Sequence, residues 1–221
     1  MTWLLPSLIT CLAGSTILIW VYGFLYDQYR ERHFALWTWS WVFYTLRFAL
    51  LLLDLTWLPW VDMEHLVHAC VLLSSYLLFM GTAEFVNKPV ARIWHLGLGL
   101  GLLWIPLSHL LDLGFLSTNL PIFTFSGLAL MWTGLLILRS PGLVSGGGRL
   151  MTGGGFMLWG LHRLDYPFLR SLDWFAPWGF LLSAILSFML AIGMLLIYFQ
   201  QIRKTLQERE HSLQISQEKF Q

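Results

Sequence analysis

Seven hydrophobic runs, separated by short polar segments, dominate the chain. They occupy residues 3–26, 34–55, 64–86, 93–113, 117–138, 150–168 and 177–199. Each run is close to the roughly 20 residues that an α-helix needs to cross the hydrocarbon layer of a bilayer. The pattern therefore predicts an all-α, polytopic membrane protein with seven transmembrane helices. The sixth run is the weakest, because it contains Gly153–Gly155 and ends in charged residues.

The pattern changes at Gln200, where the chain becomes polar and strongly helix-forming. Apolar residues recur from the last hydrophobic run into this segment at intervals of four, three, four, seven and seven. They are Leu195, Phe199, Ile202, Leu206, Leu213 and Phe220. This spacing is close to the heptad repeat of coiled coils. We therefore divide the chain into a transmembrane domain, residues 1–199, and a cytoplasmic signalling helix, residues 200–221. Its residues Ile202, Leu206 and Leu213 are expected to form a homodimer seam, and the alternative is a solvated tail with fortuitous spacing.

Composition supports the membrane interpretation. The chain is 57% hydrophobic and 11% charged, whereas a soluble domain is typically about 25% charged. Cys11 and Cys70 both fall inside predicted spans, where a disulfide framework is implausible. We expect the lipid bilayer as a partner and no nucleic acid.

The distribution of Lys and Arg predicts the orientation. The segments after the first, third, fifth and seventh runs hold Arg30, Arg32, Lys88, Arg92, Arg139, Arg149, Arg203, Lys204, Arg209 and Lys219. The opposite segments hold Arg170 alone. Because basic loops remain in the cytoplasm, the N-terminus is predicted outside, with the C-terminal helix extending into the cytoplasm.

The end of the chain resembles a known kind of sensor. The stretch Ser212–Gln221, which ends in SQEKFQ, resembles the entry into a PAS domain, and the segment LHRLDYPFLR, Leu161–Arg170, resembles a feature of seven-span sensor regions. The whole arrangement resembles the N-terminal multi-pass sensor region of bacterial PAS-containing histidine kinases and diguanylate cyclases. The resemblance implies a place in the bacterial inner membrane and a cytoplasmic output domain in cis. No catalytic motif occurs in these residues, so any enzyme activity is expected in that output domain.

Ionisable residues gather at one end of the predicted helices, the end opposite the basic segments. They are Arg47, Asp54, Glu64, His65, His68, His109, Asp112, His162, Arg163 and Asp165. Ionisable groups at membrane depth are costly and usually line a cavity, pair with one another or bind something. Residues three apart share a helix face, so His65 with His68, His109 with Asp112, and His162 with Asp165 are expected to converge in one layer.

Two interpretations of this layer involve a cofactor. In the first, imidazoles bind a transition-metal ion, with a carboxylate as a further ligand or as a partner that orients an imidazole. The candidate ligands are His65, His68, His109 and His162, and the candidate carboxylates are Glu64, Asp112 and Asp165. In the second, two facing histidines ligate the iron of haem b, for example His68 with His162 or His109, and Arg47 and Arg163 neutralise the propionates.

The third interpretation is a structural network, with or without water or another small ligand. In it, Arg47 and Arg163 form ion pairs with Asp54, Asp112 and Asp165, and the histidines are satisfied donors and acceptors. The sequence leaves these interpretations open.

The sequence favours a transmembrane sensory input module, because a polar layer at one end is combined with a heptad-like helix at the other. Two alternatives belong to other classes. A transporter or channel uses such a layer as a translocation site, and a cytochrome b-like protein carries electrons through haem.

Overall fold

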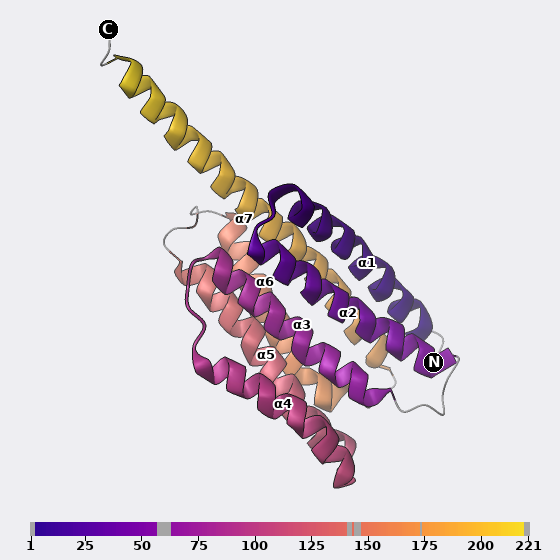
Figure 1. The fold of residues 1–221 in the computed structure, drawn as a ribbon. Coiled ribbons are helices and arrows are strands. Elements are labelled where there is room, and N and C mark those ends of the chain that lie inside the picture. Colours follow the sequence, from indigo (N-terminus) through magenta and orange to yellow (C-terminus); the bar gives the residue numbers. More distant parts are fainter. Residues whose placement is uncertain (1–2, 57–62, 141–142, 144–146, 173, 219–221) are drawn as a thin grey trace.

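The computed structural model describes residues 3–56, 63–140, 143, 147–172 and 174–218, which form seven α-helices and no strand (Figure 1). The helices are α1 (Leu4–Tyr29), α2 (Arg32–Thr56), α3 (Glu64–Phe85), α4 (Arg92–Leu110), α5 (Phe115–Arg139), α6 (Gly147–Leu169) and α7 (Ala176–Glu218). Each hydrophobic run coincides with one helix, within a few residues at most ends. The prediction of an all-α fold is confirmed.

The helices pack side by side as one bundle, and α7 extends far beyond it (Figure 1). Helix α7 lies against α1 and α6, α5 lies against α3, α4 and α6, and α4 is peripheral. We call the end where α2, α4 and α6 finish the histidine end. We call the opposite end, where α7 leaves the bundle, the exit end.

Six of the seven helices are long and apolar enough to cross a membrane, within the described residues, and α6 is the exception. The chain is therefore a multi-pass membrane protein, and its seventh crossing is an inference taken up below. Helix α6 is less apolar because part of its inner face is polar: Thr152 and Arg163 are buried. A helix packed among others can carry such residues inward, away from lipid.

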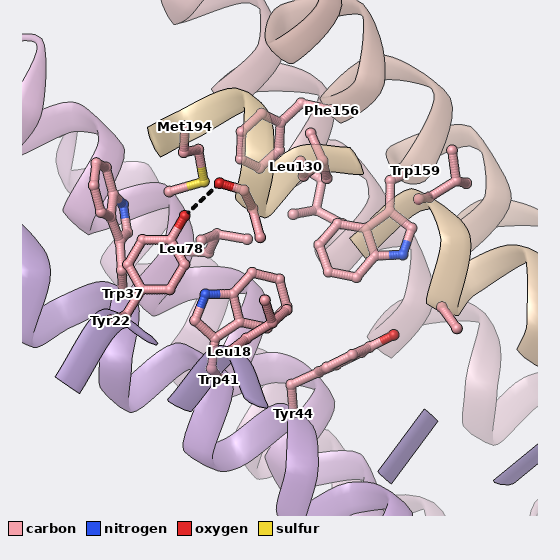
Figure 2. Close-up of a cluster of buried hydrophobic side chains, with 14 of the residues drawn as sticks. Leu18, Tyr22, Trp37, Trp41, Tyr44, Leu78, Leu130, Phe156, Trp159 and Met194 are labelled. Atoms are coloured by element: carbon pink, nitrogen blue, oxygen red, sulfur yellow. Dashed lines mark hydrogen bonds between the residues drawn. The ribbon is translucent and has the colours of Figure 1, made fainter. Parts of the chain in front are cut away.

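Aromatic side chains fill the middle of the bundle (Figure 2). The indole rings of Trp41 and Trp159 stack with centroids 6.2 Å apart, and the Tyr22 ring packs against Trp41. The Tyr22 hydroxyl donates a hydrogen bond of 2.8 Å to the carbonyl oxygen of Ala191 in α7. Three helices, α1, α2 and α6, thus meet through rings, and α1 is fastened to α7.

Helices α5 and α6 approach closely because glycines face each other. A Cβ atom at Gly127 would lie 2.8 Å from the carbonyl oxygen of Gly160, and a Cβ at Gly160 would lie 2.7 Å from that of Gly127. A second such contact joins Gly134 and Gly153. Small residues commonly allow this approach in membrane bundles, and here they bring α6 against α5.

Replacement of Gly127 by Ala is expected to destabilise the protein by about 1–3 kcal/mol, because the new methyl group forces the two backbones apart. The matched control is Gly154→Ala in α6, where a Cβ meets no atom within 4 Å. Alanine is the better helix former, so the control should be neutral or slightly stabilised. Thermal unfolding in detergent measures both, and equal effects would contradict the close contact.

Candidate functional site

The ionisable residues at the histidine end divide between two pockets. The first, which we call the histidine pocket, lies among α3, α4 and α5 and is lined by Glu64, His65, His68, Ser108, His109 and Asp112, with a cavity of about 70 Å³. The second, the arginine pocket, lies among α2, α6 and α7 and is lined by Arg47, His162, Arg163, Asp165, Arg170 and Ser183, with a cavity of about 30 Å³. The sequence predicted one layer, and the structure has two sites.

A pair of stacked rings stands between the pockets. The Phe123 ring from α5 lies 3.9 Å, centroid to centroid, from the Tyr166 ring from α6, at an interplanar angle of 12°. Phe123 also meets the His68 ring edge to face at 6.5 Å, while Tyr166 lines the arginine pocket. The stacked pair therefore touches both sites.

His68 is held in the histidine pocket by an asparagine that the sequence analysis did not single out. Its Nε2 lies 2.9 Å from Asn119 Oδ1, and because that oxygen only accepts, Nε2 carries the proton. Asn119 is itself fixed, since its Nδ2 donates to the Phe115 carbonyl at 2.9 Å. Glu64 Oε1 is 3.7 Å from the same ring nitrogen. A buried amide inside an apolar helix is the signal that identifies Asn119.

The remaining histidines of this pocket meet ring to ring. His65 from α3 and His109 from α4 have ring centroids 4.5 Å apart at 73°. Asp112 was expected to share a helix face with His109, but α4 ends at Leu110. Asp112 instead lies in the turn beyond it, with a left-handed φ of 48°, and still lines the pocket. The spacing therefore predicted correctly that Asp112 and His109 line the same site, but Asp112 lies in a turn and not on the helix.

His162 connects α6 to the first turn of α7. Its Nδ1 is 3.0 Å from Asp165 Oδ2 and its Nε2 is 2.9 Å from the carbonyl oxygen of Gly179. The carbonyl only accepts, so Nε2 carries a proton. The Asp165 contact requires a second proton, which lies either on Nδ1 or on the carboxyl group. His162 thus joins Asp165 of α6 to the backbone of α7.

Arg47 and Arg163 are buried in the arginine pocket, each only 3% exposed. The Arg47 guanidinium lies 5.3–5.6 Å from the ring centroids of Phe48, Phe123 and Tyr166. The Arg163 guanidinium lies 5.1 Å from the Trp159 ring and 5.3 Å from the Tyr44 ring. Aromatic faces from α2, α5 and α6 thus surround both positive charges.

The predicted ion pairs with aspartates do not form around these arginines. Arg47 Nε and the Nε and Nη1 atoms of Arg163 have no hydrogen-bond partner among the described residues. Asp165 bonds His162 instead, and Asp54 is exposed and outside the lining of both pockets. A cation–π contact contributes about 0.5–2 kcal/mol, whereas removing a charge from water costs several kcal/mol.

Ser183 of α7 is a further functional residue that sequence reasoning missed. The Trp159 Nε1 donates to its Oγ at 3.2 Å, and the Tyr44 hydroxyl shares a hydrogen bond with it at 2.9 Å. Both rings also cover Arg163. A serine in an apolar run is a weak sequence signal, and only the packing of α2, α6 and α7 reveals this node.

The described side chains do not fit a haem or a metal ion as they are placed. No group of three or more His, Cys, Asp or Glu within the described ranges lies close enough to hold a metal. Both ring nitrogens of His162 are engaged. Cavities of about 70 and 30 Å³ hold a few water molecules at about 10–15 Å³ each, which is far below the volume of a macrocycle.

Larger cavities lie at the exit end. One of about 640 Å³ is lined by Tyr29, Glu31, Arg32, His33, Glu84, Phe85, Asn87, Tyr198, Gln201, Ile202, Thr205, Leu206 and Arg209. His33 follows a basic turn in the sequence, yet its ring is buried among Phe34, Trp37, Phe85 and Tyr198. The part of α7 that begins at Gln201 therefore borders an open groove.

Comparison with protein-family models, with curated proteins and with solved structures found no match. The geometry of the two pockets and of α7 is thus the basis for the functional argument.

The His68–Asn119 hydrogen bond is expected to couple α3 to α5. In a double-mutant cycle with His68→Ala and Asn119→Ala, the coupling energy should be about 0.5–1.5 kcal/mol. As a control, His95→Ala paired with Asn119→Ala should give a value near zero, because His95 bonds Tyr76 instead. Unfolding in detergent gives all the free energies, and a zero value for the first pair would contradict the contact.

Proposed function

We propose that the chain is the transmembrane sensory input module of a bacterial signal-transduction protein. The observation that carries this proposal is the continuity of α7, which begins at the arginine pocket and extends beyond the exit end without a break (Figure 1). Its 43 residues correspond to a length of about 65 Å at 1.5 Å per residue. Because a continuous helix moves as a rigid body, a shift or rotation at one end also moves the other end.

The first turns of α7 supply part of the arginine pocket. Gly179 offers its carbonyl oxygen to His162, and Ser183 bonds Tyr44 and Trp159. A ligand or a proton that rearranges these contacts shifts or rotates α7 relative to α2 and α6. Such bistable contacts between packed elements are how a small local change becomes a helix movement.

We further propose seven membrane crossings, with the histidine end outside and the exit end in the cytoplasm of a bacterial inner membrane. The positive-inside rule supports this orientation, because all basic residues of the short connections except Arg170 belong to the exit end. Helix α6 crosses as well, since it is packed against α5 and α7 and runs between the two ends.

The cytoplasmic part of α7 is proposed to form a parallel homodimer and to lead to an output domain in cis, a histidine kinase or a diguanylate cyclase. Leu206 and Leu213 are 53% and 63% exposed, and seven residues bring them onto the same helix face. Ile202 is different, because it is partly buried against the bundle core. We therefore place the seam beyond Ile202, starting at Leu206.

The packing of the bundle middle supports a sensor over a translocation path. Tyr22, Trp41 and Trp159 are almost completely buried there, and Trp41 of α2 packs against both Tyr22 of α1 and Trp159 of α6 (Figure 2). A transporter generally has its substrate site near the midplane, between broken helices. Here α2 and α7 are continuous helices past this level.

Disulfide cross-linking tests the dimer. In a chain with Cys11 and Cys70 replaced by Ser, the variants Leu206→Cys and Leu213→Cys are expected to form cross-linked dimers in membranes. The controls Glu208→Cys and His211→Cys each lie about 140–160° around the helix from those two positions and should cross-link poorly. Equal cross-linking at all four sites would contradict the proposed heptad seam.

Insertions test whether α7 transmits a signal. In a chimera with a histidine kinase output region, two residues inserted after Gln207 rotate the following helix by about 200° and should change output strongly. Seven inserted residues restore the phase to within about 20° and should restore output. If both insertions behave alike, rotation of α7 does not carry the signal.

Replacement of His162 by Ala in the same chimera is expected to change basal output about fivefold or more, because two hydrogen bonds that position α7 are lost. His95→Ala is the matched control, since His95 bonds Tyr76 away from α7, and it should leave output unchanged. If output is unaltered in both variants, the arginine pocket does not take part in signalling.

A further inference from the structure

We infer that the arginine pocket binds a small anion between Arg47 and Arg163. The inference deepens the proposed function by naming the class of ligand that this pocket binds. Only the effect of that ligand on signalling rests on the proposed function. The inference is carried by two buried guanidinium groups that line a common cavity and have no negatively charged partner among the residues that the structure describes.

The first step is the imbalance of charge around the cavity. Arg47, Arg163 and Arg170 line it, and Asp165 is the only carboxylate among the lining residues that the structure describes. That carboxylate is bonded to His162, so three guanidinium groups share one carboxylate. The three arginines therefore give the pocket a net positive charge that the described side chains leave uncompensated.

The second step is the desolvation of the two inner arginines. Both are 97% buried, and N–H groups of each have no acceptor among the described residues. The positive charges of Arg47 and Arg163 also repel each other, and repulsion is strong where water is excluded. Buried charges in proteins are normally paired, and aromatic faces alone offset only part of the cost.

The third step is the size of the cavity. About 30 Å³ between the arginines and the start of α7 accommodates a halide ion or the carboxylate end of a small acid, with charge-assisted bonds from the guanidinium N–H groups. Ser183 from α7 lines the same cavity, so an anion there also bears on the helix proposed to carry the signal.

Anion-dependent stability of the purified full chain tests the inference. Protein in uncharged detergent is kept in sodium gluconate, whose anion is too large for the cavity, and bromide or acetate replaces gluconate at constant ionic strength. A saturable Tm increase of about 5–10 °C is expected at a hundredfold excess of bromide or acetate over its Kd. Equilibrium dialysis with radioactive chloride should find one ion per chain.

Arg163→Met is expected to abolish the bromide effect while remaining as stable as the natural chain in gluconate, because an uncompensated charge is removed. The matched control is Arg139→Met, an exposed arginine at the exit end, which should keep the full effect. If Arg163→Met does not fold, the dialysis stoichiometry of the natural chain decides the matter.

A second arm identifies the source of the anion. Nanodiscs with and without phosphatidylglycerol are compared, and a lipid phosphate in the pocket would give stabilisation that chloride competes away and Arg163→Met abolishes. Absence of binding and stabilisation in both arms, or an equal loss in Arg139→Met, overturns the inference. Binding without any change in chimera output leaves the anion site standing and contradicts the sensor instead.

Discussion

The burial of two arginines without a carboxylate partner among the described residues is the constraint on which the histidine end depends. In a low-dielectric bundle a guanidinium must be surrounded by something that favours its charge. Rings from α2, α5 and α6 do this for Arg47 and Arg163. The same rings then determine how these helices approach each other, and they link the two polar pockets through the stacked Phe123 and Tyr166.

Helix α7 connects the buried arginines to the opposite end of the molecule. Its first turns contact the ring cage of Arg163 through Ser183 and contact the His162–Asp165 pair through Gly179. Its last described turns extend beyond the bundle, with the exposed Leu206 and Leu213 on one face. The helix therefore connects the arginine pocket to the segment beyond the bundle, and the hydrogen bond from Tyr22 holds it between the two.

Sequence reasoning located the helices because hydrophobic length is a local property, and it placed the basic and the histidine-rich segments at opposite ends for the same reason. It was less successful for the sites. Asn119 and Ser183 were missed because a single polar residue in an apolar run has no pattern. Asp112 was put on a helix that ends at Leu110, since hydrophobicity alone does not mark the turn.

The sequence by itself determined the helical class, the positions of the spans and the uneven distribution of charge, all of which follow from residues near one another in the chain. Only the tertiary structure decided which polar groups meet. The helix periodicity gives each residue a face, but the neighbour of that face depends on how seven helices pack, and here glycine contacts bring α6 against α5. That packing separated His68 from His162, kept Arg47 and Arg163 from pairing with Asp54, Asp112 or Asp165, and joined the arginine pocket to α7.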